Sequence, residues 1–459
     1  MLTMPRQQST RLRHGFAPDP ALPSRDALLD PDSVQERLST ILGRSGPLDI
    51  EGCALVRAKY RIGESLRVVY RLQIGGTSQL VAARAFRDGA SAAALRCCDE
   101  LVAAGQLRPI AHDPSLDCVW WSFPNDRRLG NISALLTPTP DLAALLVGVP
   151  RWTSSELVEY APERSVTLRA VGADGTASAY VKAYAPGSTD LPALARRYAM
   201  VARALNRSPV SVCSPEPLWW SDAHHALLMQ ALPGRQWDQL PARSTAPALR
   251  RLGRAIAALH GSTFVTESAT MTGPLTLPFS RFRRLDRARV VHSAELVGRA
   301  RPDLAAAARR LAEALSENQP AADPDVLLHG DCHPKNALLH GEQVALLDLD
   351  QAGFGPAAAD IGSLLARLEH ARIVDDSDSN CTTNSHTETG TVDLAAAFLD
   401  GYADIRPLPD PASLLWHTSA ALLAERAMRA VNRVRPEALS RLRELLETAH
   451  TPLKAGVRP

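Results

Sequence analysis

Long apolar runs are missing from this sequence: no stretch reaches the roughly 18 apolar residues that a membrane-spanning helix needs. The N-terminal residues include arginines and prolines but no apolar core, which predicts a flexible tail over residues 1–31 and no secretion signal. A strong charge of one sign is missing as well, because the formal net charge is only +2. We therefore expect a cytoplasmic protein that binds neither a membrane nor nucleic acid.

Cysteine pairs with metal-ligand spacing are also missing. Cys97 and Cys98 are adjacent, and the others of the seven cysteines are scattered along the chain. This set favours reduced thiols in a cytosolic protein over a zinc site or a disulfide framework. What remains is an ordinary globular composition, 45% apolar and 22% charged, in a chain of 459 residues that has room for two or three domains.

One arrangement of β-like runs occurs twice, the second time about 100 residues after the first. In the first copy two runs flank a turn at Gly75 and Gly76, and in the second two runs flank Asp174 and Gly175. A helix-like stretch follows each pair. The predicted strands cover residues 66–72, 79–86, 166–170 and 179–184, and the predicted helices cover 90–104 and 191–205.

Single positions also correspond between the two copies. Tyr60 and Tyr160 occupy matching places, and Arg84 stands where Lys182 stands. The match predicts a duplicated β-rich unit, and chance similarity of two α+β segments is the alternative. Nothing in the first copy corresponds to the catalytic motif described below, so we expect this copy to be degenerate and to bind no catalytic metal.

The chain changes character from about residue 237, where helical periodicity predominates. A β-like patch at 326–347 interrupts the helices, and the polar segment 375–391 is nearly free of apolar residues, which predicts a mobile surface loop. The predicted helices cover residues 248–260, 302–315, 358–368, 394–402 and 414–431.

The β-like patch holds the residues that indicate chemistry. A predicted strand ends at His329, Gly330 and Asp331. Asn336 lies five residues after Asp331, at the start of a second predicted strand. That strand turns and returns to end on Asp348. Strands joined by a tight turn are neighbours, so Asn336 and Asp348 should lie close together, with Asp331 in the adjacent loop.

Such a group of oxygens suits one class of reaction. Mg²⁺ takes hard oxygen ligands, few of them from protein and the rest from phosphate and water. Phosphoryl transfer needs that ion to neutralise charge on the phosphate oxygens, and a carboxylate that orients the incoming hydroxyl and accepts its proton. The spacing of Asp331, Asn336 and Asp348 supplies both parts.

The sequence His-Gly-Asp-x-His-Pro-x-Asn, followed by an apolar strand and Asp-x-Asp, resembles the aminoglycoside phosphotransferase and choline kinase family. The resemblance implies an α+β, bilobal, kinase-like fold that uses ATP and Mg²⁺. It implies that Asp331 is the catalytic base and that Asn336 and Asp348 hold the metal, with Asp350 as a secondary metal carboxylate.

The same resemblance implies a nucleotide site between two lobes. Lys182 would clamp the α- and β-phosphates from the N-lobe. The stretch 227–234, Leu-Leu-Met-Gln-Ala-Leu-Pro-Gly, resembles the family's hinge, whose residues Gln230, Ala231 and Leu232 would carry the adenine. Residues before about 151 have no counterpart in the family's minimal pattern.

Each assignment has a plain structural alternative. Asp331 could cap a turn, Asn336 could form an Asx-turn, and Asp348 could be a salt-bridged strand end. Lys182 could be a solvated residue of an edge strand, and Asp350 could serve either structure or metal binding.

Three further residues are expected to have structural roles. For His329 and His333 we expect scaffold roles, in which the side chain hydrogen-bonds the loop backbone, rather than proton transfer. For Asp360, which precedes an apolar helix, we expect a capping role.

The pattern departs from kinase-like proteins at two points. A helix glutamate normally pairs with the strand lysine, but the helix predicted at 191–205 contains no acidic residue and offers Arg196 and Arg197 instead. There is also no Gly-x-Gly-x-x-Gly segment. Gly330 replaces the arginine of protein kinases and no Ala-Pro-Glu follows, which argues against a protein kinase.

These observations predict an ATP-dependent phosphotransferase that acts on a hydroxyl of a small molecule such as a sugar, amino sugar, aminoglycoside or amino alcohol. The alternative is a nucleotide-binding pseudokinase that serves as an interaction module. The expected domains are 32–149, a degenerate duplicate that could mediate self-association, 150–236, the N-lobe, and 237–459, the helical C-lobe.

Overall fold

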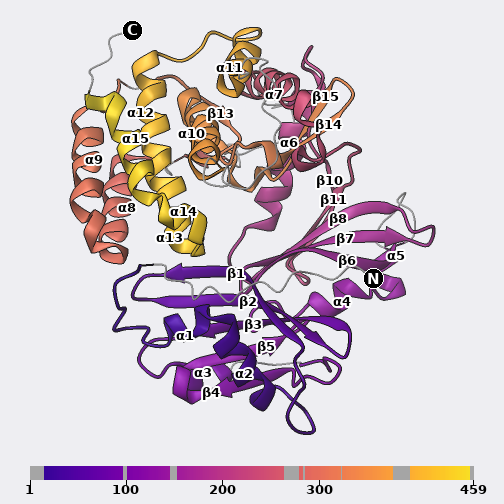
Figure 1. The fold of residues 1–459 in the computed structure, drawn as a ribbon. Helices are drawn as coiled ribbons and strands as arrows, with labels where there is room; N and C mark the ends of the chain where they lie inside the picture. Colours follow the sequence, from indigo (N-terminus) through magenta and orange to yellow (C-terminus); the bar gives the residue numbers. More distant parts are fainter. Residues whose placement is uncertain are drawn as a thin grey trace, which may run out of the picture.

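The computed structural model describes residues 15–96, 101–144, 152–262, 279–282, 285–321, 323–375 and 393–454. The protein has an α+β, bilobal, kinase-like fold with an additional N-terminal sheet domain (Figure 1). Apart from Asp375, the expected mobile loop 375–391 lies outside the described residues, as do residues 1–14 and the adjacent Cys97 and Cys98. Within the described ranges, no helix combines the length and the apolar character that crossing a membrane requires.

The N-terminal domain is built on a five-stranded antiparallel sheet with the order β1-β2-β3-β5-β4. Its first predicted hairpin turns at Gly75 and Gly76 as expected, and both residues have a positive φ, 54° and 71°, which glycine adopts without strain. The strands are β1 Gly52–Arg61, β2 Ser65–Ile74, β3 Thr77–Ala85, β4 Ile110–Asp113 and β5 Cys118–Ser122, and the helices are α1 Arg25–Leu29, α2 Pro31–Ile41 and α3 Ser91–Leu95.

The helix predicted at 90–104 is shorter in the structure, because α3 ends at Leu95 and residues 101–103 are not helical. The side chain of Asn125 accepts a hydrogen bond from the Val102 N–H (2.8 Å) and donates one to the Val102 carbonyl (3.0 Å). An amide that satisfies both backbone groups of one residue offers an alternative to helical hydrogen bonds.

The second sheet repeats the first. Its order is β6-β7-β8-β11-β10, so the fifth strand again lies between the third and the fourth, and a helix again follows the third strand. The N-terminal domain is thus a second copy of the N-lobe sheet. The strands are β6 Trp152–Ala161, β7 Ser165–Gly172, β8 Ala177–Tyr184, β10 Pro217–Ser221 and β11 Ala226–Gln230, with α4 Ile132–Leu136 and α5 Pro140–Ala144 before them and α6 Leu191–Asn206 between β8 and β10.

The same tyrosine–aspartate pair anchors each copy. Tyr60 donates its hydroxyl hydrogen to Asp19 over 2.7 Å, and Tyr160 donates to Asp126 over 2.7 Å. Each aspartate precedes its tyrosine in the sequence and lies outside the strands. The segment before the first strand is therefore part of each unit.

The carboxylates of Asp19 and Asp126 also hold the turn that follows the first strand of each copy. They accept the backbone N–H of Gly63 (2.9 Å) and of Glu163 (2.8 Å). Both turn residues have a left-handed backbone, with φ of 73° and 59°. Glu163 adopts this conformation although it is not a glycine, which is uncommon. Unlike Gly63, it places a carboxylate at the turn.

These contacts correct two expected boundaries. The flexible tail does not extend to residue 31, because residues 15–31 pack on the first sheet with Leu22, Leu28 and Leu29 buried. The N-lobe unit begins upstream of 150, because Asp126 belongs to it and Ser155 donates a hydrogen bond to the Leu135 carbonyl of α4 over 2.7 Å.

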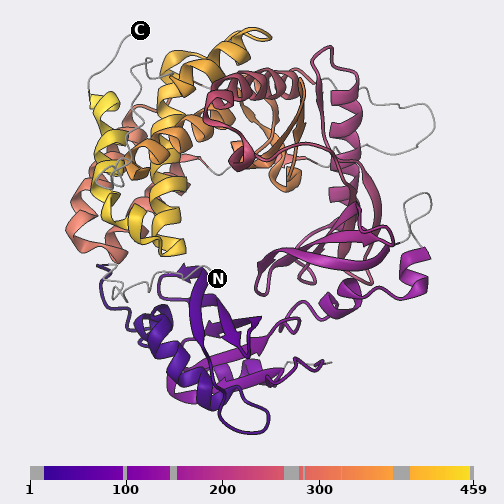
Figure 2. The same cartoon turned by 45° about the vertical axis from the view of Figure 1, so that its right-hand side comes forward.

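One apolar core is shared by the two sheets. It contains Val69, Val119 and Trp121 from the first copy, and Val166 and Leu168 from the second. The indole of Trp121, which is 1% exposed, also donates a hydrogen bond to the hydroxyl of Tyr160 over 2.7 Å. The N-terminal domain therefore packs against the N-lobe through a shared apolar core (Figure 2).

The C-lobe is helical, as predicted, and is crossed by short strands that carry the catalytic motif. The single helix predicted at 414–431 is interrupted in the structure by a π-helical segment at Leu422–Ala427. The helices are α7 Thr245–His260, α8 Arg287–Ala300, α9 Ala305–Glu317, α10 Ala357–Asp375, α11 Leu394–Ala403, α12 Pro411–Ala421, α13 Met428–Arg433, α14 Pro436–Ser440 and α15 Leu442–Lys454, and the strands are β12 Ser280–Arg281, β13 Asp325–Leu328, β14 Ala337–His340, β15 Gln343–Leu346 and β16 Gly353–Pro356.

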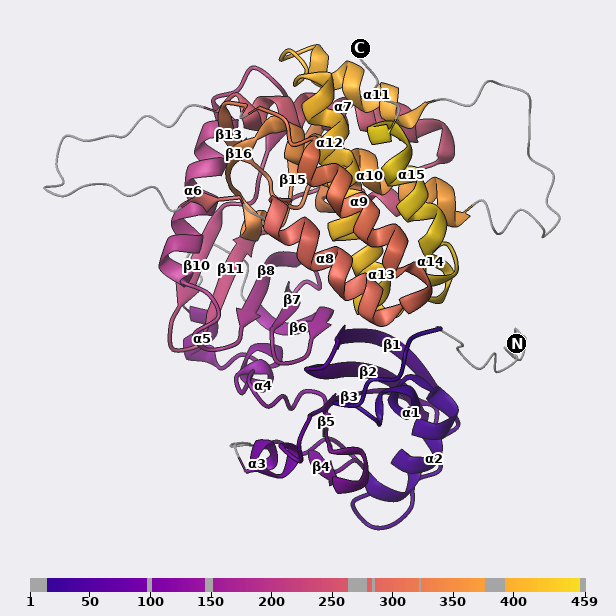
Figure 3. The ribbon, with the colours of Figure 1, turned by 90° about the vertical axis from the view of Figure 1, so that its left-hand side faces the viewer.

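The N-terminal domain touches the C-lobe as well as the N-lobe. Helix α13 contacts β1, and the views in Figures 1 and 3 place the C-lobe helices directly over the edge of the first sheet. The two lobes of the kinase-like part are joined separately by β9 Val212–Cys213, which pairs in parallel with β15.

Candidate active site

The catalytic loop follows β13 and is shaped by Gly330. This residue has φ +79°, and a Cβ there would lie 2.1 Å from the carbonyl oxygen of Gln351. Only glycine fits at this place. Asp360 in the first turn of α10 accepts the backbone N–H of His329 (2.6 Å) and of Gly330 (2.9 Å). The sequence predicted that Asp360 caps its helix, but its carboxylate instead holds the backbone of the catalytic loop.

The carboxylate of Asp360 is completely buried and has a third partner. His260 on α7 approaches it with Nε2 at 3.2 Å. Burial alone would raise the pKa of Asp360, but the hydrogen bond and charge of His260, together with the His329 N–H, lower it below its usual value. The loop is therefore tied to two helices of the C-lobe through one ionised carboxylate.

The predicted convergence of Asn336 and Asp348 is present in the backbone. Strands β14 and β15 pair antiparallel, and the Leu347 N–H donates to the carbonyl of Asn336 over 2.8 Å. The side-chain nitrogen of Asn336 donates to the backbone carbonyl of Asp331 over 3.0 Å. This bond leaves the amide oxygen of Asn336 as the atom that a cation would take. Asp348 has φ 56°, an uncommon backbone for a residue other than glycine.

Lys182 of β8 meets both carboxylates of the Asp-x-Asp motif. Its ammonium lies 2.8 Å from Asp348 Oδ1 and 2.7 Å from Asp350 Oδ2, and its side chain is only 16% exposed. Burial alone would lower the pKa of Lys182, but the charges of Asp350 and Asp348 raise it well above its usual value. Lys182 is therefore no solvated edge residue, and it stays protonated over the physiological range.

The two carboxylates have different surroundings. Burial would raise the pKa of Asp350, but Lys182 and the hydroxyls of Tyr198 (3.0 Å) and Tyr184 (3.0 Å) lower it. Burial raises the pKa of Asp348, against the opposing charge of Lys182. The Asp348 side chain is 43% exposed and that of Asp350 only 18%. Asp348 is the more accessible carboxylate, and the roles of Asp348 and Asp350 in metal binding stay predictions.

Helix α6 contributes tyrosine where kinase-like proteins place an acidic residue. Tyr198 donates to Asp350 and accepts the Leu349 N–H over 2.9 Å, and Arg197 donates to the Asp350 carbonyl over 2.6 Å. The role of Tyr198 was not predicted from the sequence. Tyr198 lies one turn after Leu194 and Ala195, and this spacing indicates that it faces the interior on the same side of the helix.

The two histidines of the motif differ from what was expected of them. His329 is 1% exposed, and neither of its ring nitrogens has a hydrogen-bond partner among the residues that the structure describes. Its backbone, not its ring, joins the loop network. His333 Nε2 lies 4.0 Å from Asp331, and burial together with the charge of Arg367 lowers the pKa of His333 to about 3. His333 is therefore neutral near pH 7.

The expected hinge lies at the end of β11. The Gln230 N–H donates to the Glu216 carbonyl over 2.9 Å, and the chain continues through Ala231 and Leu232 into the C-lobe. Beyond the hinge, Arg235 exchanges two backbone hydrogen bonds with Leu339 of β14, at 2.9 and 3.0 Å. The hinge residues thus connect the sheet to the catalytic hairpin, and their contact with adenine stays a prediction.

A cavity of about 320 Å³ opens beside Lys182, below the turn between β6 and β7. Arg164, Ser165, Tyr184 and Asp350 line it together with Lys182. A positive wall at a turn that precedes the lysine strand suits phosphate groups.

The residues present fit a magnesium ion that is shared with a phosphate. No group of three or more histidine, cysteine, aspartate or glutamate side chains suited to a metal occurs within the described ranges. An all-protein cage is therefore absent from that part of the chain. One amide oxygen from Asn336 and one carboxylate from Asp348 are the kind of sparse oxygen set that Mg²⁺ completes with phosphate and water.

The two lobes, the hinge and the loop with its paired lysine and carboxylates define a kinase-like phosphotransferase architecture. A model of the phosphotransferase enzyme family matches residues 161–417, more than half of the chain. The protein belongs to this family. The match begins at the end of β6 and excludes the first sheet.

Three solved structures that match the chain are under 25% identical to it. A macrolide 2′-phosphotransferase from Brachybacterium faecium is 21% identical, with a TM-score of 0.40 over 70% of this chain and 98% of its own. An amicoumacin kinase in complex with AMP-PNP, Ca²⁺ and its antibiotic is 15% identical, with a TM-score of 0.44 over 70% and 91%. A choline/ethanolamine kinase family protein from Mesorhizobium loti is 17% identical, with a TM-score of 0.41 over 70% and 92%.

No curated protein matches the sequence. Membership of the family thus rests on the family model.

Proposed function

We propose that the protein transfers the γ-phosphoryl group of ATP to a hydroxyl group of a small molecule. The observation that carries this proposal is the contact of Lys182 with Asp348 (2.8 Å) and Asp350 (2.7 Å) beside the loop that bears Asp331. The proposal assigns Lys182 to the phosphates, Asp348 to the metal and Asp331 to the proton. These are the parts that phosphoryl transfer requires.

In the proposed reaction the acceptor oxygen forms a bond to the γ-phosphorus while the bond between that phosphorus and the bridging oxygen of ADP breaks. Asp331 orients the acceptor hydroxyl and takes its proton. Asn336 and Asp348 would hold Mg²⁺, which neutralises charge on the phosphate oxygens when it is bound. Lys182 would bind the α- and β-phosphates, and Gln230, Ala231 and Leu232 would contact the adenine.

A nucleotide-binding module without catalysis is the second candidate, favoured by the lack of an acidic residue on α6. Two observations weigh against it. Lys182 is anchored by Asp348 and Asp350 instead, and Tyr198 of α6 holds Asp350 in place. The missing helix carboxylate therefore does not leave the lysine without an anchor. Self-association through the N-terminal domain stays a prediction.

The decisive experiment compares the wild type with Asp331→Asn in ATP turnover with Mg²⁺, with and without a panel of alcohols. We expect turnover that needs an acceptor and falls about 10²- to 10⁴-fold in the variant, because a general base contributes that much. Nucleotide binding should be retained. The control is Asp303→Asn, which removes an exposed carboxylate from the C-lobe surface.

Two results would count against the enzyme. ATP binding without turnover on any acceptor would favour the binding module. Full turnover in Asp331→Asn would remove the base from the mechanism while leaving a phosphotransferase.

A further inference from the structure

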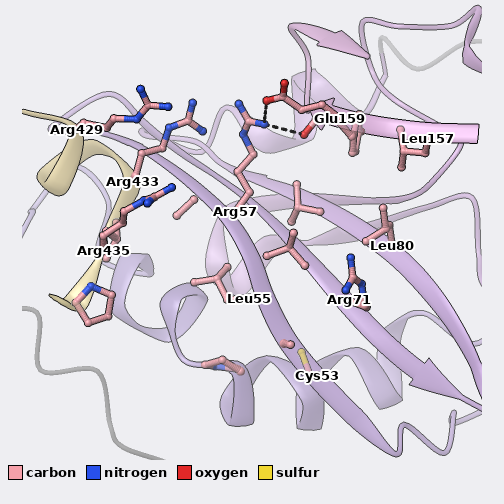
Figure 4. Close-up of a pocket in the computed structure, with 18 of the residues that line it drawn as sticks. Cys53, Leu55, Arg57, Arg71, Leu80, Leu157, Glu159, Arg429, Arg433 and Arg435 are labelled. Atoms are coloured by element: carbon pink, nitrogen blue, oxygen red, sulfur yellow. Dashed lines mark hydrogen bonds and ion pairs between the residues drawn. The ribbon is translucent and has the colours of Figure 1, made fainter. Parts of the chain in front are cut away.

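A second cavity lies outside the site above, where β1 of the N-terminal domain, β6 of the N-lobe and α13 of the C-lobe meet. It measures about 870 Å³, a size that suits a small-molecule ligand. We call it the basic cavity, because Arg57, Arg71, Arg429, Arg433 and Arg435 line it. Figure 4 shows Arg429 and Arg433 reaching from α13 towards Arg57 of β1.

A chain of shared residues connects the basic cavity to the phosphate clamp. It shares Arg57 and Arg433 with a small cavity whose wall also contains Arg164. Arg164 in turn lines the cavity at Lys182. The small cavity thus has residues in common with both the basic cavity and the cavity at Lys182.

Positive charge predominates along this chain of cavities. The small cavity adds Lys59, Arg61 and Arg67 to the arginines already named, and the acidic residues in the two walls are Glu159 and Glu437. Glu159 is already paired with Arg57 at 2.6 Å.

Several of these cations have no carboxylate partner. In the part of the chain that the structure describes, no ion pair joins Lys59, Arg71, Arg164, Arg433 or Arg435 to an acidic side chain. Lys59 and Arg433 are half-buried, whereas Arg71, Arg164 and Arg435 are exposed. Half-buried cations without counter-charges are costly unless an anion completes the site.

The neighbouring positive charges also change the pKa values of these groups. Burial and, in the same direction, the charges of Arg433, Arg61 and Arg164 together lower the pKa of Lys59 to about 8. Burial also lowers the pKa of Arg433 to about 9, with Arg57 adding to the effect. Bringing an anion into the cavity would reverse these shifts.

The positive region continues to the catalytic loop. Burial lowers the pKa of Arg367 to about 9, and the nearby Arg426 and Arg429 add to this, while Asp331 and Glu425 oppose it. Arg429 therefore belongs both to the basic cavity and to the surroundings of the catalytic loop. A cationic acceptor would approach Asp331 against this field.

We propose that the acceptor of this enzyme is an anionic alcohol, a small molecule with a hydroxyl group and a phosphate or carboxylate group, whose anionic group binds in the basic cavity. The inference rests on the proposed function, because it names the acceptor of that reaction. The hydroxyl lies at Asp331, Arg433 and Arg57 bind the anionic group, and Lys59 adds its positive charge from the adjoining small cavity. The N-terminal domain thus supplies one wall of the acceptor site.

The test measures phosphoryl transfer to matched acceptors that differ only in charge. Glucose, glucosamine, glucuronate and glucose 1-phosphate have the same ring and differ in net charge, and glycerol, glycerate and glycerol 3-phosphate form a second set. With full-length protein, ATP and Mg²⁺, we expect the anionic members to have a kcat/KM at least about tenfold above their neutral counterparts, the scale of one charge-assisted hydrogen bond. Increasing NaCl should reduce this preference.

Variants locate the preference. Arg433→Gln and Lys59→Gln should raise KM for the best anionic acceptor about tenfold, with a smaller change in kcat and no change in KM for ATP. Arg309→Gln is the matched control, because this α9 arginine is 74% exposed and lines none of the cavities described above. Each variant's thermal unfolding is recorded, so that a fold defect is distinguished from lost anion binding.

Each outcome decides between the two proposals. Faster transfer to neutral or amino compounds overturns the anionic acceptor and leaves the phosphotransferase standing. An anionic compound that binds in calorimetry with ADP and Mg²⁺, but is not itself phosphorylated while another alcohol is, also overturns it and makes the cavity a regulatory site. Transfer to none of the compounds, with no turnover on a wider alcohol panel, is the failure of the proposed function itself.

Discussion

A single buried carboxylate, Asp360, holds the catalytic loop in this protein. It accepts two loop N–H groups, those of His329 and Gly330, and faces His260. Hydrogen bonds to a charged group are worth about 1.5–3 kcal/mol each, more than bonds between neutral groups. The sequence gives this residue only as the start of a helix, because its partners are 30, 31 and 100 residues away.

We predict that Asp360→Asn lowers the free energy of unfolding by about 2 kcal/mol at pH 7, because the amide keeps one acceptor and loses the charge. The pKa of Asp360 is lowered in the folded state, so its contribution is present above the unfolded value of about 3.9 and is lost as pH falls through the lower folded value. Urea unfolding at several pH values should therefore show the wild-type and variant curves converging below about pH 4.

The matched control is Asp410→Asn. This residue is an exposed N-cap of α12, and asparagine caps a helix as well as aspartate does. If Asp360→Asn were as stable as the control at pH 7, Asp360 would not be the anchor of the loop.

At the scale of elements, the turn between β6 and β7 is held by the N-terminal domain. Glu163 lies at that turn with no exposed surface, and its carboxylate contacts Arg67 (2.6 Å), Arg84 (2.7 Å) and Arg127. Arg84 occupies in the first copy the place that Lys182 occupies in the second. In the first copy the strand cation thus contacts the N-lobe turn.

The charges of this cluster are not balanced. Burial would raise the pKa of Glu163, but Arg84, Arg67 and Arg127 lower it. Burial lowers the pKa of Arg84, and Arg67 and Arg127 add to this effect against the attraction of Glu163. Three guanidinium groups therefore depend on a single carboxylate.

We predict that Glu163→Gln costs about 3–5 kcal/mol of stability, because removing one member of a buried ion pair leaves the others without compensation. The released turn borders the cavity at Lys182, so KM for ATP should rise as well. Equilibrium unfolding and steady-state kinetics measure the two effects.

Glu156→Gln serves as the control, since this glutamate of β6 is 58% exposed and pairs only with Arg169. A Glu163→Gln protein with normal stability and a normal KM for ATP would show that the N-terminal domain does not position the turn.

Contacts between residues that are close in the sequence can be predicted from it, and contacts between distant residues cannot. The catalytic loop and the hairpin with Asn336 and Asp348 were predictable, because strand, turn and strand follow each other directly. The duplication was predictable because both copies keep the same order of elements. The partners of Lys182 were not, since Asp348 lies 166 residues away and its contact depends on how two lobes pack.

The whole molecule is expected to unfold as one unit, because its sheets share a core. Trp121 of the first sheet is buried against Val166 and Leu168 of the second and donates its indole N–H to Tyr160. Trp121→Ala should cost about 3–5 kcal/mol, the usual price of removing a large buried aromatic side chain. If the two sheets unfold together, the loss of stability must appear in both of them.

Hydrogen exchange along a urea series can follow β2 and β8 separately in the wild type and in Trp121→Ala. We expect one midpoint for both strands in each protein, and a shift of both to lower urea in the variant. Trp220→Ala is the control, because this tryptophan is 41% exposed on the edge strand β10 and its removal should leave both midpoints in place. Separate midpoints, or a shift of β2 alone, would mean that the N-terminal domain folds independently, and its wall of the basic cavity would then be free to move relative to the catalytic lobes.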